Sequence, residues 1–142
     1  MQIHIKSNLQ KLQVANNKIL RVILNKPLQT ALEDLYSPFK LLSLSNMHKY
    51  QLLKLVHTWM YNKTLLPSTF DNYFELATSV HGFSLRNCLS LQVHSVSSSI
   101  GGRNIKILSS KLWNTDTKFH TISNSKQFNR ELYEVLKSEV EV

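Results

Sequence analysis

The sequence predicts a mainly α-helical protein, a single small domain of 142 residues. Apolar residues recur every three or four positions along several segments, which is the spacing of an amphipathic helix. Serine or threonine precedes several of these segments as an expected N-cap, and Pro27, Pro38 and Pro67 follow as breaks. Because 42% of the residues are hydrophobic, the chain can bury a core, which excludes a wholly disordered protein.

The first expected element is an amphipathic helix from about Ser7 to Leu24. Its apolar positions are expected to form one inward seam, interrupted by Asn16, with three cations on the opposite face. The seam comprises Leu9, Leu12, Ile19 and Ile23, flanked by Leu20, and the cations are Lys11, Lys18 and Arg21.

Three more helices are expected before residue 78. A short one follows Thr30, with Thr30 and Glu33 as a capping box, and a longer one covers residues 46–63, capped by Ser45. A third short helix is expected over residues 67–76. The long helix would bury an apolar stripe that consists of Leu52, Leu55, Val56, Trp59 and Met60. Its opposite side would carry a stripe of rings and one cation, which consists of Tyr50, Lys54, His57 and Tyr61.

The pattern changes after Thr78, where apolar and polar residues alternate in two short runs that are compatible with a β-hairpin around residues 89–108. Trp113 is expected to be a core anchor, as is Trp59. Ser125 would cap a last helix over residues 126–139, with Phe128, Leu132 and Val135 or Leu136 facing inward. The domain would thus consist of a basic helical part (1–78), a loop and hairpin part (79–125) and a C-terminal helix (126–142).

Seventeen basic residues stand against nine acidic ones, a net charge of +8. The excess is concentrated in residues 1–65, which carry nine basic and two acidic side chains. A basic half favours a polyanionic partner, nucleic acid first and a membrane surface second. An ordinary solvated, lysine-rich surface is the alternative.

No catalytic or metal site is predicted, and no cofactor. The histidines lack carboxylate or cysteine partners at ligand spacing, and the single cysteine, Cys88, excludes an internal disulfide framework and fits an intracellular location. A nuclease that uses histidines with Asp71 or Asp116 is the least favoured hypothesis.

Surface binding is the favoured function. Lys11, Lys18 and Arg21 are candidate phosphate contacts. Tyr50, Lys54, His57 and Tyr61 combine rings and a cation, which suits single-stranded nucleic acid. The alternatives are that the first face is merely solvated and that both tyrosines pack under a neighbouring helix.

The run Leu9-Gln10-Lys11-Leu12-Gln13, followed by residues 17–23, resembles the L-Q-x-L-Q-N-x-x-L-R-x-I run after the polymerase core of non-LTR retrotransposon reverse transcriptases, the jockey-like elements above all. The similarity continues in the same order through Leu41-Leu42-Ser43-Leu44, Tyr50-Gln51-Leu52, Leu66-Pro67, His81-x-Phe83-x-x-Arg86, Lys111-Leu112-Trp113-Asn114 and Ser125…Phe128…Leu132…Leu136. Two motifs depart from the family pattern, because its usual H-x-Y-x-T-R has lost the tyrosine and threonine and its W-N-x-L-P has lost the Leu-Pro.

The resemblance implies a C-terminal, post-polymerase module that helps to hold template RNA or target DNA. Arg86 is a further candidate phosphate contact. The expected location is the cytoplasm or nucleus, and no membrane partner is expected. The family has a polymerase palm with paired aspartates and an endonuclease domain, and neither has a counterpart in this sequence. We therefore expect this chain alone not to be an enzyme. Its parent family is RNA-directed DNA polymerase. The alternative is a protein-interaction or oligomerisation domain, whose first helix docks by its apolar face on a polymerase core domain or on a second copy of itself.

Overall fold

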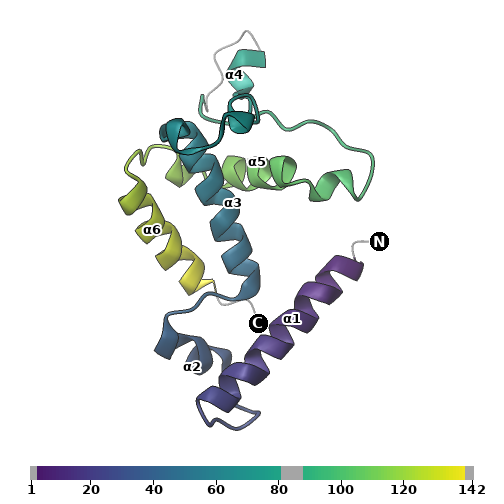
Figure 1. The fold of residues 1–142 in the computed structure, drawn as a ribbon, viewed down its shortest axis with the longest axis vertical. Coiled ribbons are helices and arrows are strands. Elements are labelled where there is room, and N and C mark those ends of the chain that lie inside the picture. The colour runs from purple at the N-terminus through teal and green to yellow at the C-terminus, as the bar shows by residue number, and fades with distance from the viewer. Residues whose placement is uncertain (1–2, 81–87, 140–142) are drawn as a thin grey trace. The chain divides into compact units, whose positions relative to one another are not determined.

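A computed structural model describes residues 3–80 and 88–139 of the chain (Figure 1). These residues are mainly helical, as predicted. The α-helices are α1 (Ile3–Ile23), α2 (Leu32–Tyr36), α3 (Leu44–Tyr61), α4 (Ala77–Val80), α5 (Ile105–Thr115) and α6 (Ser125–Ser138), joined by loops and short 3₁₀ turns.

The chain divides into two compact units. Unit 1 comprises residues 1–48 and 133–142, and unit 2 comprises residues 49–132. The boundaries fall inside α3 and α6, so unit 1 contains α1, α2, the start of α3 and the end of α6.

In unit 1, α1 packs on α2 through a small apolar cluster of Leu20, Leu35 and Tyr36, with Leu24 and Leu32 against it. The predicted first helix is confirmed, although it begins at Ile3 rather than near Ser7. After α1 the chain turns at Asn25, whose φ of 49° is left-handed, a conformation that asparagine tolerates better than most residues.

The predicted inward seam of α1 is wrong at three of its four positions, although Leu20, which flanks the seam, is buried as expected. Leu12, Ile19 and Ile23 are 61%, 57% and 62% exposed. The helix instead turns Gln13, Asn16 and Asn17 toward the hydroxyl of Tyr36 on α2. The reason is that the short helix α2 presents the buried phenol of Tyr36 to α1. A buried hydroxyl without hydrogen-bond partners costs free energy, so polar side chains of α1 face it.

Two helices are capped by a residue that precedes the predicted cap. Ser43 Oγ accepts a hydrogen bond from the Asn46 amide at the start of α3, and Asn124 Oδ1 accepts from the Lys126 and Gln127 amides at the start of α6. The capping box expected at Thr30 is wrong, because the Thr30 hydroxyl donates to the Pro27 carbonyl instead. The predicted helix over residues 67–76 is reduced to a 3₁₀ turn, Ser68–Phe70.

The core of unit 2 is aromatic. Trp113 of α5, Phe119 of the 3₁₀ turn that follows it, and Phe128 of α6 are buried, and Phe128 packs edge-on against Phe119. The α3 residues Leu52 and Val56 are buried as predicted. Leu132 and Leu136 of α6 are also buried, each in its own unit, which confirms the expected inward positions of the last helix.

The predicted hairpin over residues 89–108 is absent from the described residues. Residues 105–115 form α5, which starts where the Asn104 side chain accepts a hydrogen bond from the Lys106 amide. The alternation of Ile105 and Ile107 was too short to define a strand, because the apolar positions that follow continue at helical spacing. Leu91 forms only an isolated antiparallel bridge with Leu76.

Candidate functional site

The predicted phosphate contacts on α1 lie on the surface of unit 1. Lys11 and Lys18 are exposed, and neither forms an ion pair with a described residue. Arg21 is half-buried, and its Nε is buried without a hydrogen-bond acceptor among the residues described. In this position the Arg21 guanidinium would still present its two terminal nitrogens to a ligand, whereas the burial of Nε without an acceptor costs free energy. Lys11 and Lys18 are therefore the more accessible cations.

The second predicted group, in unit 2, does not form one exposed stripe. His57 is 1% exposed and stacks on the Phe128 ring at 4.0 Å between centroids, and its Nε2 lies 2.7 Å from the Ile122 carbonyl oxygen. The Tyr61 hydroxyl donates to the His120 carbonyl. The expectation that His57 lies on the surface beside Lys54 is wrong, because its ring completes the aromatic core.

Burial changes the ionisation of this group. It lowers the pKa of His57, an effect that the hydrogen bond to the Ile122 carbonyl opposes, and it raises the pKa of Tyr50 and of Tyr61, with a further rise at Tyr61 from Cys88. His57 is therefore disfavoured as a cation in the folded protein. Of the four residues, Lys54 is exposed, whereas Tyr50 and Tyr61 are half-buried. Arg86, the last predicted contact, lies outside the described residues.

The two units divide the positive charge differently from the prediction that residues 1–65 form the basic half of the protein. Unit 1 carries seven basic and five acidic residues, a net charge of +2, whereas unit 2 carries ten and four, a net charge of +6. The basic residues 49, 54 and 63 belong to unit 2, and the acidic tail belongs to unit 1. The basic stretch 1–65 is thus not one structural unit.

Two adjacent side chains of α5 have a structural role: Trp113, which was expected to be a core anchor, and Asn114, which the sequence offered only as part of a family motif. The Trp113 indole donates to the Leu89 carbonyl at 2.9 Å. The Asn114 amide both accepts from the Leu91 amide and donates to the Leu91 carbonyl, each at 2.8 Å. Asn114 therefore takes the place of a neighbouring strand for Leu91, and this pair fixes residues 89–91 on α5.

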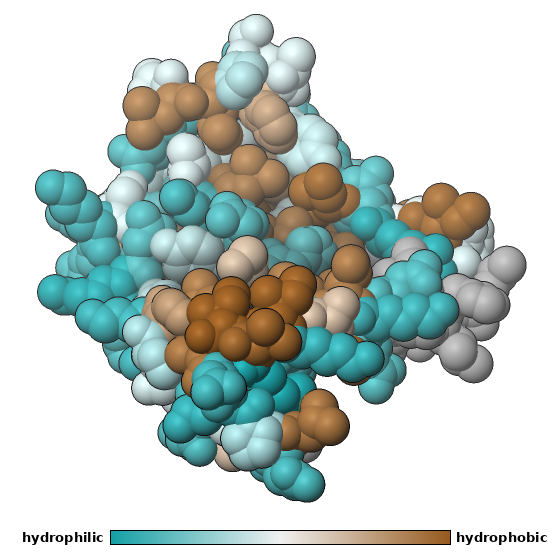
Figure 2. All heavy atoms as spheres, turned by 60° about the horizontal axis from the view of Figure 1, so that its bottom comes forward, coloured by the Kyte–Doolittle hydropathy of each residue, from teal (hydrophilic) through white to brown (hydrophobic). Residues whose placement is uncertain are grey.

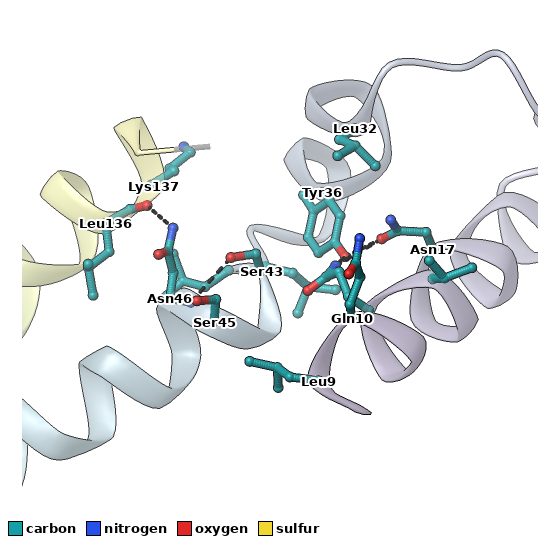
Figure 3. Close-up of a pocket in the computed structure, with 14 residues that line it drawn as sticks. Leu9, Gln10, Asn17, Leu32, Tyr36, Ser43, Ser45, Asn46, Leu136 and Lys137 are labelled. Atoms are coloured by element: carbon teal, nitrogen blue, oxygen red, sulfur yellow. Dashed lines mark hydrogen bonds between the residues drawn. The ribbon is translucent and has the colours of Figure 1, made fainter. Parts of the chain in front are cut away.

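Unit 1 also contains a cavity of about 510 Å³ that the sequence did not predict (Figure 3). Its lining includes aliphatic side chains such as Leu9 and Leu136 and the amides of Gln10 and Asn17. Figure 3 shows Asn46, at the start of α3, directed toward the end of α6. Asn46 Nδ2 donates to the carbonyls of Leu136 and Glu139 at 2.8 and 2.6 Å.

The cavity is lined by apolar side chains and amides. Among its described lining residues there is no carboxylate, imidazole or thiol that would serve as a general acid, base or nucleophile. Asn46 Oδ1 is buried there without a donor from the described residues. The cavity can accept an apolar group, but its amides are largely engaged in holding the helices together.

The outer side of α1 carries several exposed aliphatic side chains. Leu12, Ile19, Val22 and Ile23 are 57–81% exposed, and we call these four residues the α1 stripe. Figure 2 brings forward the side of unit 1 that carries the end of α1 and α2, where hydrophobic side chains gather within a hydrophilic surround. Such surface on a folded protein commonly marks an interaction site.

Across residues 3–80 and 88–139 there is no group of three or more potential metal ligands, and no helix there is long and apolar enough to span a bilayer. Comparison of the chain with protein-family models, with curated proteins and with solved structures finds no match in any of the three.

Proposed function

We propose that this chain is a non-catalytic module that binds RNA or DNA, derived from the C-terminal, post-polymerase region of a reverse-transcriptase-like retroelement protein. The observation that carries the proposal is the net charge of +8 together with exposed lysines, Lys11 and Lys18 in unit 1 and Lys54 in unit 2, that no described carboxylate neutralises. The sequence resemblance supports the same function. On this proposal the chain requires no cofactor, acts in the cytoplasm or nucleus, and leaves RNA-directed DNA synthesis to its parent family.

Binding of this kind is electrostatic. Lysine ammonium groups at the surface contact phosphates and release condensed counterions, so affinity falls steeply with salt. Base stacking has a smaller part than the sequence suggested, since the Tyr61 hydroxyl is bonded inside unit 2 and His57 is buried. We therefore expect weak discrimination between base sequences.

The test is a titration of labelled single-stranded RNA and DNA with the full chain at several salt concentrations. Replacing Lys11 and Lys18 with glutamine is expected to reduce the slope of log K against log salt by about 1.4–1.8, which corresponds to two lost phosphate contacts. Lys111→Gln, an exposed lysine on α5, removes charge elsewhere and is the matched control. No binding at low salt would refute the function, and an equal effect of Lys111→Gln per charge would refute the location on α1.

A second candidate function is protein interaction or oligomerisation through the apolar face of α1. The α1 stripe specifically favours it, because aliphatic side chains that remain exposed contribute to stability only when a partner covers them. The partner on this hypothesis is a polymerase core domain or a second copy of the chain. Sedimentation velocity over a range of protein concentrations tests self-association directly, since a monomer at every concentration excludes the second copy.

A further inference from the structure

We propose that the α1 stripe docks an amphipathic helix of another protein, and that acidic side chains border the apolar face of that helix. This inference rests on the second candidate function and specifies its partner. Three observations support it: the exposed aliphatic side chains of α1, the positive charge beside them, and the poor fit of other occupants.

α1 carries apolar side chains on both of its sides. Toward α2 it presents Leu20 and Leu24 beside the amides that surround the Tyr36 hydroxyl, and its outer face carries the stripe. A surface helix normally buries its apolar side and solvates its polar side. Because the stripe extends over three turns, it matches the length of a helix-in-groove or paired-helix contact.

A row of positive charge runs beside the stripe. Lys11 and Lys18 directly precede Leu12 and Ile19, and both pairs are seven residues apart, so the two rows follow the helix in parallel about 100° from each other. No acidic residue occurs between Ile3 and Leu32. In paired helices, charges beside the apolar seam select the partner, so this row selects aspartate and glutamate.

Other occupants fit less well. Two copies that met through their stripes would bring the lysine rows together with no carboxylate of α1 to neutralise them. A lipid surface favours aromatic side chains at the interface, and α1 has none. Nucleic acid would engage the lysines, but aliphatic side chains neither stack on bases nor hydrogen-bond their edges.

The experiment uses the full chain and two synthetic helical peptides of about 21 residues, that is, three heptads. Both carry leucine at the a and d positions; one has glutamate at e and g, and the other has lysine there. Fluorescence anisotropy at about 0.1 M salt, where screening is moderate, measures binding. We expect the glutamate peptide to bind at least tenfold more tightly than the lysine peptide and to weaken as salt rises.

Variants locate the contact. Ile19→Ser together with Ile23→Ser is expected to weaken binding of the glutamate peptide at least tenfold, and Leu12→Ser with Val22→Ser gives an independent second pair. Circular dichroism checks that each variant stays helical. Leu65→Ser in unit 2 is the matched control, because Leu65 is an equally exposed leucine outside α1, and its binding should not change.

Four results would overturn the proposal: equal binding of the two peptides, unchanged binding by both serine pairs, dimerisation of the chain alone at this salt concentration, or binding to phosphatidylglycerol vesicles with none to either peptide. The nucleic-acid function fails or survives separately. The serine pairs are expected to leave the salt slope for RNA unchanged, whereas loss of Lys11 and Lys18 should reduce both activities. Peptide binding without RNA binding would therefore discard only the nucleic-acid function.

Discussion

The hydrogen bonds between α1 and the phenol of Tyr36 on α2 give the sharpest test of the fold of unit 1. The Tyr36 hydroxyl donates to Asn17 Oδ1 and accepts from Gln13 and from Asn16, the last at 3.1 Å. Tyr36→Phe removes all three hydrogen bonds. Gln13 still donates to Asn17 at 3.0 Å, and the half-buried Asn16 amide can bind water. The main loss is therefore the buried bond to Asn17, and we expect unfolding to become easier by about 2 kcal/mol.

Urea denaturation followed by the helical circular-dichroism signal measures this change. With a slope of about 2 kcal/mol/M, the midpoint is expected to fall by about 1 M. Tyr133→Phe is the matched control, since its hydroxyl makes a single bond, 2.7 Å long, to the Lys40 carbonyl at the surface, and its loss should cost about 0.5 kcal/mol. Equal effects of the two Tyr→Phe changes would refute the polar attachment of α1.

Three further predictions concern single residues. Asn114→Ala leaves both backbone groups of the buried Leu91 without their partner and should cost about 2 kcal/mol, with faster hydrogen exchange at the Leu91 amide. The pKa of His57 is lower in the folded than in the unfolded chain, so the unfolded chain binds more protons below about pH 6.5. The free energy of unfolding, measured with urea, should therefore decrease as the pH falls below that value. His57→Gln should make this decrease smaller. Lys40 has a φ of 50°, so Lys40→Gly should stabilise unit 1 by about 0.5–1 kcal/mol, seen as a higher melting temperature.

The sequence was a good guide to helices and a poor one to what they face. Helical spacing located α1, α3 and α6 because long periodic segments reflect a physical requirement for one buried side. The buried side of α1 was nevertheless wrong. Periodicity groups apolar residues together, but it does not show that the neighbouring element is short and presents the Tyr36 hydroxyl. Asn16, which was interpreted as an interruption of the seam, was the only available signal of this contact.

The candidate site was partly predictable for the same reason. Lys11, Lys18 and Lys54 are exposed, as their charge requires. His57 is amphipathic, so spacing along α3 could not decide between a surface ring and a ring stacked on Phe128. The hairpin was wrong because Leu91 obtains its backbone partners from the side chain of Asn114, which no pattern of alternation reveals. That a tryptophan and an asparagine are adjacent in a motif was the one indication.

The order of elements along the chain has a kinetic consequence. Unit 2 is continuous, whereas unit 1 needs two stretches separated by all of unit 2, and Asn46 is hydrogen-bonded to carbonyls ninety residues further on. Closing so long a loop costs entropy before its contacts form, which slows folding. During synthesis the complete unit 2 leaves the ribosome while Asn46, at the start of α3, still lacks its partners in the final turns of α6. A chain truncated after residue 132 should therefore keep the contact of α1 with α2 but leave Asn46 without its partners on α6, which produces a half-assembled species.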